Sequence, residues 1–361
     1  KALAYCRQAG EKAIARSAHR EAVGFFEQAL SALEHLPERQ DTCALANYYL
    51  GLAYQVQGDY RRAIDCFRQT AASLSGARRR ERFGVDLLPS VLSRAYLACC
   101  HAELGTFAEG RTFGEEGLRI AEAVDQPGSL MFAYYGVGLP SLRQGDLPRA
   151  LLWLERAVRI CHEADLPGWF PRMAGALGAA YTLAGRVADA VPLLMQGIEE
   201  STATQRVHFE MLCRLPLGEA QVLAGHLEEA QALAERALTL ARAHQERGHE
   251  AYALWLFGQI AVHHDPPAGE AAETQYRQAL AQALGMRPLQ AHCHLGLGNL
   301  YARDGRREQA RAELCTAIEL YRAMEMTFWL PQAEEALRQA RSSLPLPTQR
   351  QRGLSSSVHR R

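Results

Sequence analysis

The sequence predicts an all-α protein, a right-handed superhelical solenoid of about eight helix pairs with a C-terminal capping helix. Two observations predict this fold. Short motifs recur about every 40 residues along most of the 361-residue chain, which is typical of stacked structural repeats. The composition is rich in Ala, Leu, Glu and Arg and 48% hydrophobic, which favours helices, and no segment alternates apolar and polar residues as a strand does.

One repeat unit shows the pattern clearly, in the segment 50–67. Gly51 would let the second helix of the pair approach closely, and Tyr54 would fill the space between the helices. Gly58 would take the turn with its permissive backbone. Ala63 would lie where the two helices cross. A small residue and an aromatic on the first helix, a glycine turn and an alanine on the second helix together resemble the tetratricopeptide repeat.

The same positions recur at a nearly constant interval. Successive turn glycines are 40 residues apart three times in a row, which chance does not plausibly produce. One unit has a longer turn at 263–267 in place of the glycine. The recurring glycines are Gly58, Gly105, Gly145, Gly185, Gly225 and Gly305 in the turns, and Gly51, Gly138, Gly178, Gly218 and Gly298 on the first helices.

Helical periodicity supports this assignment independently. Through 147–161, apolar residues recur at i, i+3, i+4 and i+7, so that one face of the segment is apolar. Asp146, which precedes Leu147 and Pro148, is typical of a helix start with proline in the first turn.

The recurrence divides residues 1–341 into eight units and a cap. The interval exceeds the usual tetratricopeptide length of about 34 residues, so longer helices and links are expected. Residues 342–361 are rich in Pro, Ser, Gln and Arg and are predicted to be a disordered tail. The expected units are 3–40, 44–80, 91–126, 130–165, 171–203, 210–247, 250–285 and 290–325, followed at 329–341 by a capping helix that closes the exposed core face.

Two parts of the sequence resemble the C-terminal repeat region of bacterial signalling ATPases. The segments 9–13 and 22–30 resemble the first helices after the ATPase module, and 317–330 resembles the last repeat and cap. In that family a class III adenylate or guanylate cyclase domain often precedes the ATPase. The resemblance implies a sensor or scaffold that regulates catalytic domains upstream of Lys1, in a longer parent protein. No catalytic residue of the family is matched, since the chain contains no Gly-Lys-Ser/Thr phosphate loop.

Charge and composition exclude several classes of partner. Forty Lys and Arg balance forty Asp and Glu, whereas general nucleic-acid binding requires a positive surplus. No apolar stretch approaches the length of a membrane span. Nine dispersed cysteines without a framework spacing are typical of a reducing compartment, so we expect a cytoplasmic protein without a cofactor.

Several local clusters could suggest chemistry, but structural roles account for them better. His292-Cys293-His294 and His263-His264-Asp265 lack a second ligand pair at zinc spacing, so no metal is expected. Cys99-Cys100-His101 is expected to pack in a helix rather than supply a nucleophile. The arginine-rich run 78–82 and the tail arginines Arg350, Arg352, Arg360 and Arg361 are expected to be solvated.

Recognition is expected on the concave wall formed by the first helices. The sequence therefore predicts a non-catalytic interaction scaffold that binds a peptide, a protein or the rest of its own polypeptide, including attached ATPase or cyclase domains. A regulatory part of a signalling enzyme is the alternative, and a transcriptional regulator is a weaker one, since no DNA-binding head is visible. The candidate groove residues are Tyr48, Gln55, Tyr135, Arg172, Thr182, Glu219, Trp255, Gln259, His292 and Asn299.

Overall fold

The computed structural model describes residues 8–10, 12–13, 18–33, 40–83, 85–264, 268–283 and 285–342. These residues form helices and turns, and no strand occurs among them. The all-α solenoid predicted from the sequence is confirmed. The expected disordered tail lies outside the described residues, apart from residue 342, which ends the last helix.

Helix pairs follow one another along the chain, and we call the first and second helix of each pair the A helix and the B helix. The A helices are α3 (Gln40–Gln57), α5 (Pro89–Leu104), α7 (Pro127–Gln144), α9 (Phe170–Leu183), α11 (Val207–Ala224), α13 (Arg247–His263) and α15 (Arg287–Arg303). The B helices are α2 (His19–Leu33), α4 (Tyr60–Ser73), α6 (Phe107–Glu122), α8 (Leu147–Glu163), α10 (Val187–Ala203), α12 (Leu227–His244), α14 (Gly269–Gln282) and α16 (Arg307–Ala323). The cap is α17 (Leu330–Ser342), and two short 3₁₀ helices are η2 (Gly76–Arg80) and η3 (Pro167–Trp169).

The turn from α7 to α8 shows how the sequence ends one helix and starts the next. Gly145 has a φ of 88°, a left-handed conformation that costs glycine little, and its N–H donates to the carbonyl of Leu142. The side chain of Asp146 then accepts a hydrogen bond of 3.3 Å from the backbone N–H of Arg149, which caps α8 as expected.

Glycines on the A helices allow close packing of each pair. A Cβ atom on Gly138 would lie 2.7 Å from Cγ of Leu154, and one on Gly298 would lie 2.5 Å from Cγ of Leu314. Both distances are far below van der Waals contact. The A and B helices of a pair therefore approach closely only because these positions carry no side chain.

A second turn recurs at the ends of the B helices, where the sequence shows no glycine pattern. Five non-glycine residues there adopt positive φ between 51° and 58°. They are 40 residues apart along the chain, and Gly285, with a φ of 88°, occupies the remaining place in the series. The five residues are Asp125, Asp165, Gln205, Gln245 and Glu325.

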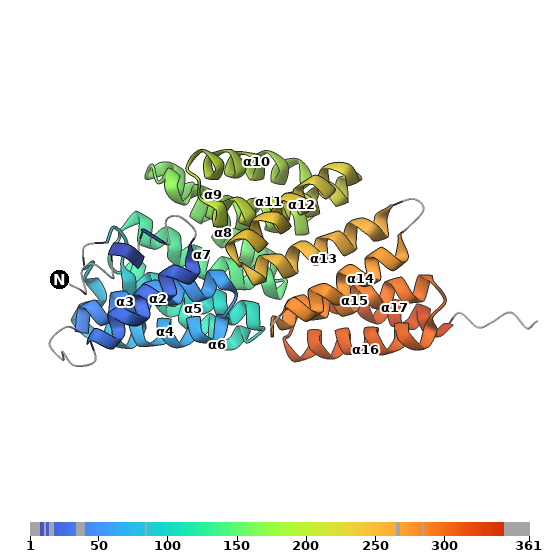
Figure 1. Cartoon of the computed structure of the whole chain (residues 1–361), viewed down its shortest axis with the longest axis horizontal. Helices are drawn as coiled ribbons and strands as arrows, with labels where there is room; N and C mark the ends of the chain where they lie inside the picture. Colours follow the sequence, from blue (N-terminus) through green and yellow to red (C-terminus); the bar gives the residue numbers. More distant parts are fainter. Residues whose placement is uncertain are drawn as a thin grey trace, which may run out of the picture.

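The superhelix closes on itself, so the first units contact the last. In Figure 1, α2–α6 lie at the lower left, α9–α12 at the top and α14–α17 at the lower right. Residues of α5 contact α15, and residues of α3 contact α13. The side chain of Gln144 donates to the carbonyl of Met324 across 180 residues of sequence, at 3.4 Å. The inner faces of the A helices therefore surround a central space.

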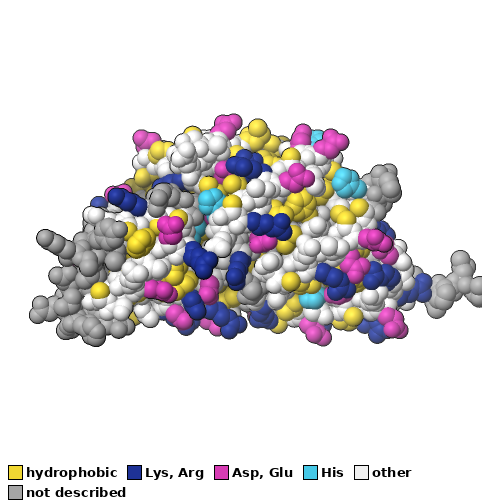
Figure 2. Space-filling model, in the orientation of Figure 1, with side chains coloured by type: hydrophobic (Ala, Val, Ile, Leu, Met, Phe, Trp, Pro, Cys, Tyr) yellow, Lys and Arg dark blue, Asp and Glu magenta, His cyan; other side chains and the backbone are white. Residues whose placement is uncertain are grey.

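Among the described residues, no helix has both the length and the apolarity that crossing a membrane requires. Figure 2 shows acidic and basic side chains interspersed on the face it presents, as the zero net charge of the sequence implies.

Candidate functional site

A central cavity of about 180 Å³ lies inside the closed superhelix. Every A helix from α3 to α15 contributes side chains to its wall. Tyr60, at the start of α4, and Trp329, next to the capping helix, complete the lining. The cavity wall is therefore built from every unit between α3 and α15 and from Trp329 beyond them.

Six of the ten candidate groove residues line this cavity, and four do not. The six are Gln55, Tyr135, Arg172, Glu219, Trp255 and His292. Tyr48 is buried among aromatic rings, with its ring centroid 6.2 Å from that of Phe67. Thr182 donates to the carbonyl of Gly178 at 2.9 Å, and Gln259 donates to the hydroxyl of Tyr276 at 2.8 Å. Asn299 is exposed outside the cavity lining.

Arg172 is the most unusual charge in the cavity wall, because its side chain is only 4% exposed and is surrounded by aromatic rings. Its guanidinium carbon lies 4.9 Å from the ring centroid of Phe209 and 5.4 Å from that of Tyr96. One nitrogen donates to the hydroxyl of Tyr135 at 3.3 Å, while Nε has no partner. No ion pair of Arg172 occurs in the described part of the chain.

A second arginine increases the positive charge near Arg172. The guanidinium carbon of Arg206 lies 5.0 Å from the ring centroid of Phe209, the same ring that Arg172 faces. Burial and the charge of Arg172 lower the pKa of Arg206. A buried cation is costly unless an anion accompanies it, so this side of the cavity favours a negatively charged ligand group.

A second set of charged side chains, around Arg143 of α7, lines another part of the cavity wall. Arg143 Nε donates to Glu103 Oε1 at 2.9 Å, and the guanidinium lies 4.7 Å from the ring centroid of Tyr252. Glu219 has no hydrogen-bond partner among the described residues. Burial raises the pKa of Glu219 to about 7, although the nearby charge of Arg143 opposes the shift. This side of the cavity therefore offers a carboxylate to a donor group of a ligand.

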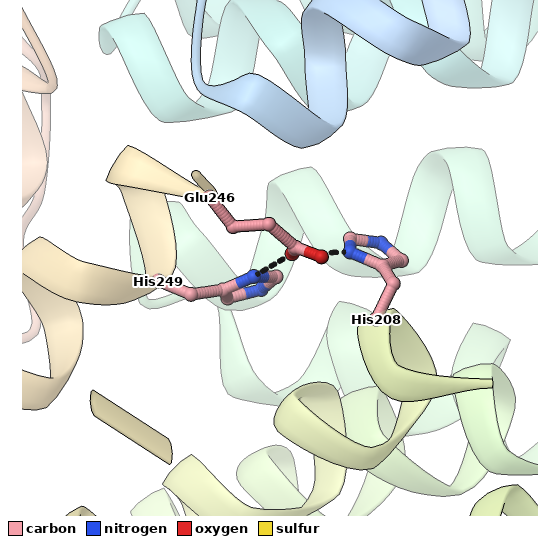
Figure 3. A group of neighbouring side chains, drawn as sticks. All are labelled: His208, Glu246 and His249. Carbon is pink, nitrogen blue, oxygen red and sulfur yellow. Dashed lines mark hydrogen bonds and ion pairs between the residues drawn. The ribbon is translucent and has the colours of Figure 1, made fainter. Parts of the chain in front are cut away.

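A histidine–glutamate cluster borders the cavity, and we call His208, Glu246 and His249 the His–Glu group (Figure 3). Oxygen Oε2 of Glu246 accepts hydrogen bonds from Nδ1 of His208 at 2.8 Å and from Nδ1 of His249 at 2.7 Å. Nε2 of His19, at the start of α2, lies 3.6 Å from the other oxygen, Oε1. His208 and His249 both line the cavity.

Burial sets the protonation of this cluster. Glu246 is fully buried, which opposes ionisation, but the surrounding histidines hold its pKa well below the usual range. Burial lowers the pKa of His208 to about 4, so its imidazole is uncharged at neutral pH. Oxygen Oε2 of the ionised carboxylate therefore lies between the imidazoles of His208 and His249.

The sequence analysis did not find this group because its members lie in different units. His208 is in the first turn of α11, Glu246 immediately precedes α13, and His249 is in the first turn of α13. His208 and His249 are 41 positions apart, close to one repeat, which is the signal that could have paired them.

Of the two candidate metal clusters predicted to be structural, 292–294 has its histidines in contact with different residues. Nδ1 of His292 lies 2.8 Å from the hydroxyl of Tyr321, whereas Nδ1 of His294 lies 2.5 Å from Glu313 on α16. Cys293, between them, is fully buried. His263 contacts the carbonyl of Gln259, and Asp265 lies outside the described residues.

The other chemical candidates take structural positions. Burial raises the pKa of Cys99 to about 12 and that of Cys100 well above its usual value, so both remain thiols. His101 contacts the hydroxyl of Thr106 through Nδ1 at 2.7 Å. Arg79, in η2, pairs with Glu116 at 3.4 Å. The tail arginines lie outside the described residues.

These features define a class of protein, a closed solenoid of tetratricopeptide-like helix pairs around an internal cavity. A family model described as a tetratricopeptide repeat matches residues 291–324, which lie in α15, α16 and the link that follows. Comparison with curated proteins gives no match.

Several solved structures are similar to this chain. A Rap protein complexed with competence and sporulation factor is 13% identical, with a TM-score of 0.55 over 94% of this chain and 97% of that one. NprR in complex with its cognate peptide NprX is 14% identical, with a TM-score of 0.55 over 83% of this chain and 88% of that one. A signal-transduction ATPase with a tetratricopeptide-repeat sensor, from Pyrococcus horikoshii, is 14% identical over 89% of this chain and 46% of that one, with a TM-score of 0.45. At these identities the likeness to the Rap protein and to NprR shows the fold alone.

Proposed function

We propose that this chain is a non-catalytic scaffold or sensor that binds a peptide, or an extended segment of a protein, in its central cavity. The observation that carries the proposal is the buried guanidinium of Arg172, which faces the cavity without a carboxylate partner in the described chain. A carboxylate of a bound peptide would supply the missing charge. The peptide ligands of the Rap protein and of NprR accord with this proposal.

The cavity also suggests the length of the segment. Tyr135, which bonds Arg172, and Arg143, whose charge acts on Glu219, are eight residues apart on α7. Eight helical residues rise about 12 Å. An extended chain covers that distance with about four residues. We therefore propose a segment with an acidic group at one end and a hydrogen-bond donor or cation at the other.

Selection from a random peptide library, carried out on the whole chain, tests the proposal. Peptides enriched on the wild-type protein should bind Arg172→Gln at least 10-fold more weakly, because an interaction with a buried charge is lost. Arg186→Gln is the matched control, since Arg186 lies over the ring of Tyr181 outside the cavity lining. Equal binding to wild type and to both Arg172→Gln and Trp255→Ala would contradict binding in the cavity.

A finer proposal is that the bound state regulates catalytic domains of a longer parent protein. It is supported by the resemblance of 9–13, 22–30 and 317–330 to signalling ATPases that carry cyclase domains. The reading frame upstream of Lys1 tests it directly. A phosphate-loop ATPase encoded there would support regulation in cis, and a start codon immediately before Lys1 would contradict it.

A further inference from the structure

Unpaired polar atoms gather around Glu246 more than at any other place in the described chain. Eleven buried side-chain nitrogen and oxygen atoms lack a hydrogen-bond partner, and four of them belong to His19, His208 and Glu246. Buried polar atoms are nearly always paired, and a cluster of exceptions is a common sign of a bound ion or water. The four atoms are Nδ1 and Nε2 of His19, Nε2 of His208 and Oε1 of Glu246.

The charge of the cluster favours a cation over water. Glu246 is fully buried, and its contacts are histidines, with no Lys or Arg paired to it in the described residues. Arg172 is close enough to affect His208 electrostatically, but its guanidinium bonds to Tyr135. A buried carboxylate without a cationic side chain beside it is costly unless a counterion accompanies it.

We propose that His208, Glu246 and His249 bind one divalent transition-metal ion of the zinc class, with an open coordination position towards the central cavity. One ligand atom from each of the three residues lies within 4.8 Å of the others. Two imidazoles and one carboxylate suit Zn²⁺ better than Mg²⁺ or Ca²⁺, which prefer oxygen ligands. Three protein ligands leave one position of a tetrahedral ion for another donor.

To hold the ion, the three ligand atoms, which lie within 4.8 Å of one another, must adopt the spacing of a tetrahedral site. Zinc bonds of about 2.0–2.2 Å in a tetrahedron place the ligand atoms roughly 3.3 Å apart. Each Nδ1 now lies 2.7–2.8 Å from Oε2, so the rings would move back by about 0.5 Å as the ion replaces the shared hydrogen bonds. A histidine that binds an ion through Nδ1 carries its hydrogen on Nε2, so the hydrogen that each Nδ1 now shares with Oε2 would leave that nitrogen.

His19 acts as a positioning residue in this arrangement. Its Nε2 faces Oε1 of Glu246 at 3.6 Å, which leaves Oε2 for the ion. His19 comes from the first unit, whereas His208 and His249 come from α11 and α13 and Glu246 immediately precedes α13. Residues that orient a metal-bound carboxylate typically change metal affinity by about 10–100-fold when they are removed.

Cobalt(II) titration of the chelator-treated full chain tests the proposal, because Co²⁺ takes zinc sites and has visible absorption. We expect one equivalent of Co²⁺ to bind, without a thiolate-to-cobalt charge-transfer band, and one equivalent of Zn²⁺ to displace it. His208→Gln and His249→Gln should each weaken binding at least 10-fold, and His19→Gln about 10-fold. His249, which is half-buried, is the safer substitution for folding.

The matched control is His294→Gln, since His294 also contacts a carboxylate, that of Glu313, but without a third ligand. It should leave cobalt binding unchanged. No stoichiometric binding by the folded wild-type chain would overturn the proposal. Equal binding by wild type and folded His249→Gln, or a thiolate band that disappears in Cys43→Ser and Cys315→Ser, would also overturn it. Because no peptide is present in the titration, its result is independent of peptide binding.

Discussion

Tyr252 donates a hydrogen bond of 2.8 Å to Glu103, although 149 residues separate them in the sequence. The same carboxylate pairs with Arg143, and the Arg143 guanidinium lies over the Tyr252 ring. Two consecutive units and a third one far along the chain therefore meet at one part-buried polar cluster on the cavity wall.

Loss of this hydrogen bond should weaken the closed superhelix. In Tyr252→Phe, one oxygen of Glu103 loses its donor, and we expect the free energy of unfolding to fall by about 1–2 kcal/mol. Urea denaturation measures the change. Tyr181→Phe is the control, because it removes an exposed hydrogen bond to Glu155 and should alter stability by about 0.5 kcal/mol or less. Equal effects of the two substitutions would show that the closure contributes nothing to stability.

Replacement of glycine by alanine should have opposite effects on stability at two positions, because only one of the two glycines is closely packed. Gly178→Ala should destabilise the protein by about 1–3 kcal/mol, because the new Cβ would overlap the side chain of Leu194. Gly24→Ala should stabilise it by about 0.5–1 kcal/mol, since that helical glycine has no atom within 4 Å of the added Cβ. Thermal unfolding of both variants checks the prediction. An unchanged transition for Gly178→Ala would contradict the assigned packing.

The left-handed residues at the ends of the B helices predict stabilising substitutions. Gln245 has a φ of 58°, a conformation that costs a residue with a side chain about 1–2 kcal/mol. Glycine avoids this cost but loses about 0.5–1 kcal/mol in backbone entropy. We therefore expect Gln205→Gly and Gln245→Gly each to add roughly 0.5–1 kcal/mol of stability. Gln231→Gly, in the helical interior of α12, should instead destabilise the chain by about 1 kcal/mol.

Glu219 should make stability depend on pH in a defined window. Burial raises its pKa in the folded state from 4.5 to about 7, so the folded chain binds more protons than the unfolded chain between these values. Stability contributed by this group is therefore lost as the pH rises from about 4.5 to 7. Glu219→Gln should flatten this part of the profile, as measured by urea denaturation at pH 5 and pH 8. An unaltered profile would contradict burial of this carboxyl group.

The helix pairs were predictable from the sequence because their packing needs small residues at fixed places. Gly138 and Gly298, for example, face a leucine of their own B helix, and their spacing directly reflects that contact. The left-handed ends of the B helices escaped prediction because Asp, Gln and Glu occupy them in place of glycine. A search for glycine therefore finds the turn between the A and B helices of a unit but not the turn after the B helix.

The candidate site was only partly predictable, since it depends on how far the units curve. An A helix presents one face to its own B helix and others to its neighbours, so a residue such as Tyr48 is buried where a groove residue was expected. Gln259 and Asn299, near the ends of α13 and α15, extend beyond the cavity lining. The His–Glu group forms only because the N-terminal ends of α11 and α13 lie side by side. No local sequence pattern predicts that contact.

The closed cavity has a thermodynamic consequence. Its wall includes Gln55 and Trp329, which are far apart in the sequence, so an occupant that fills the cavity contacts both. An opened superhelix could not offer the same set of contacts. Any occupant that binds the closed form more tightly shifts the balance between closed and open chains by the ratio of its two affinities, and a tenfold ratio corresponds to about 1.4 kcal/mol. The fraction of chains in the closed superhelix therefore depends on which ligand occupies the cavity and how tightly it binds.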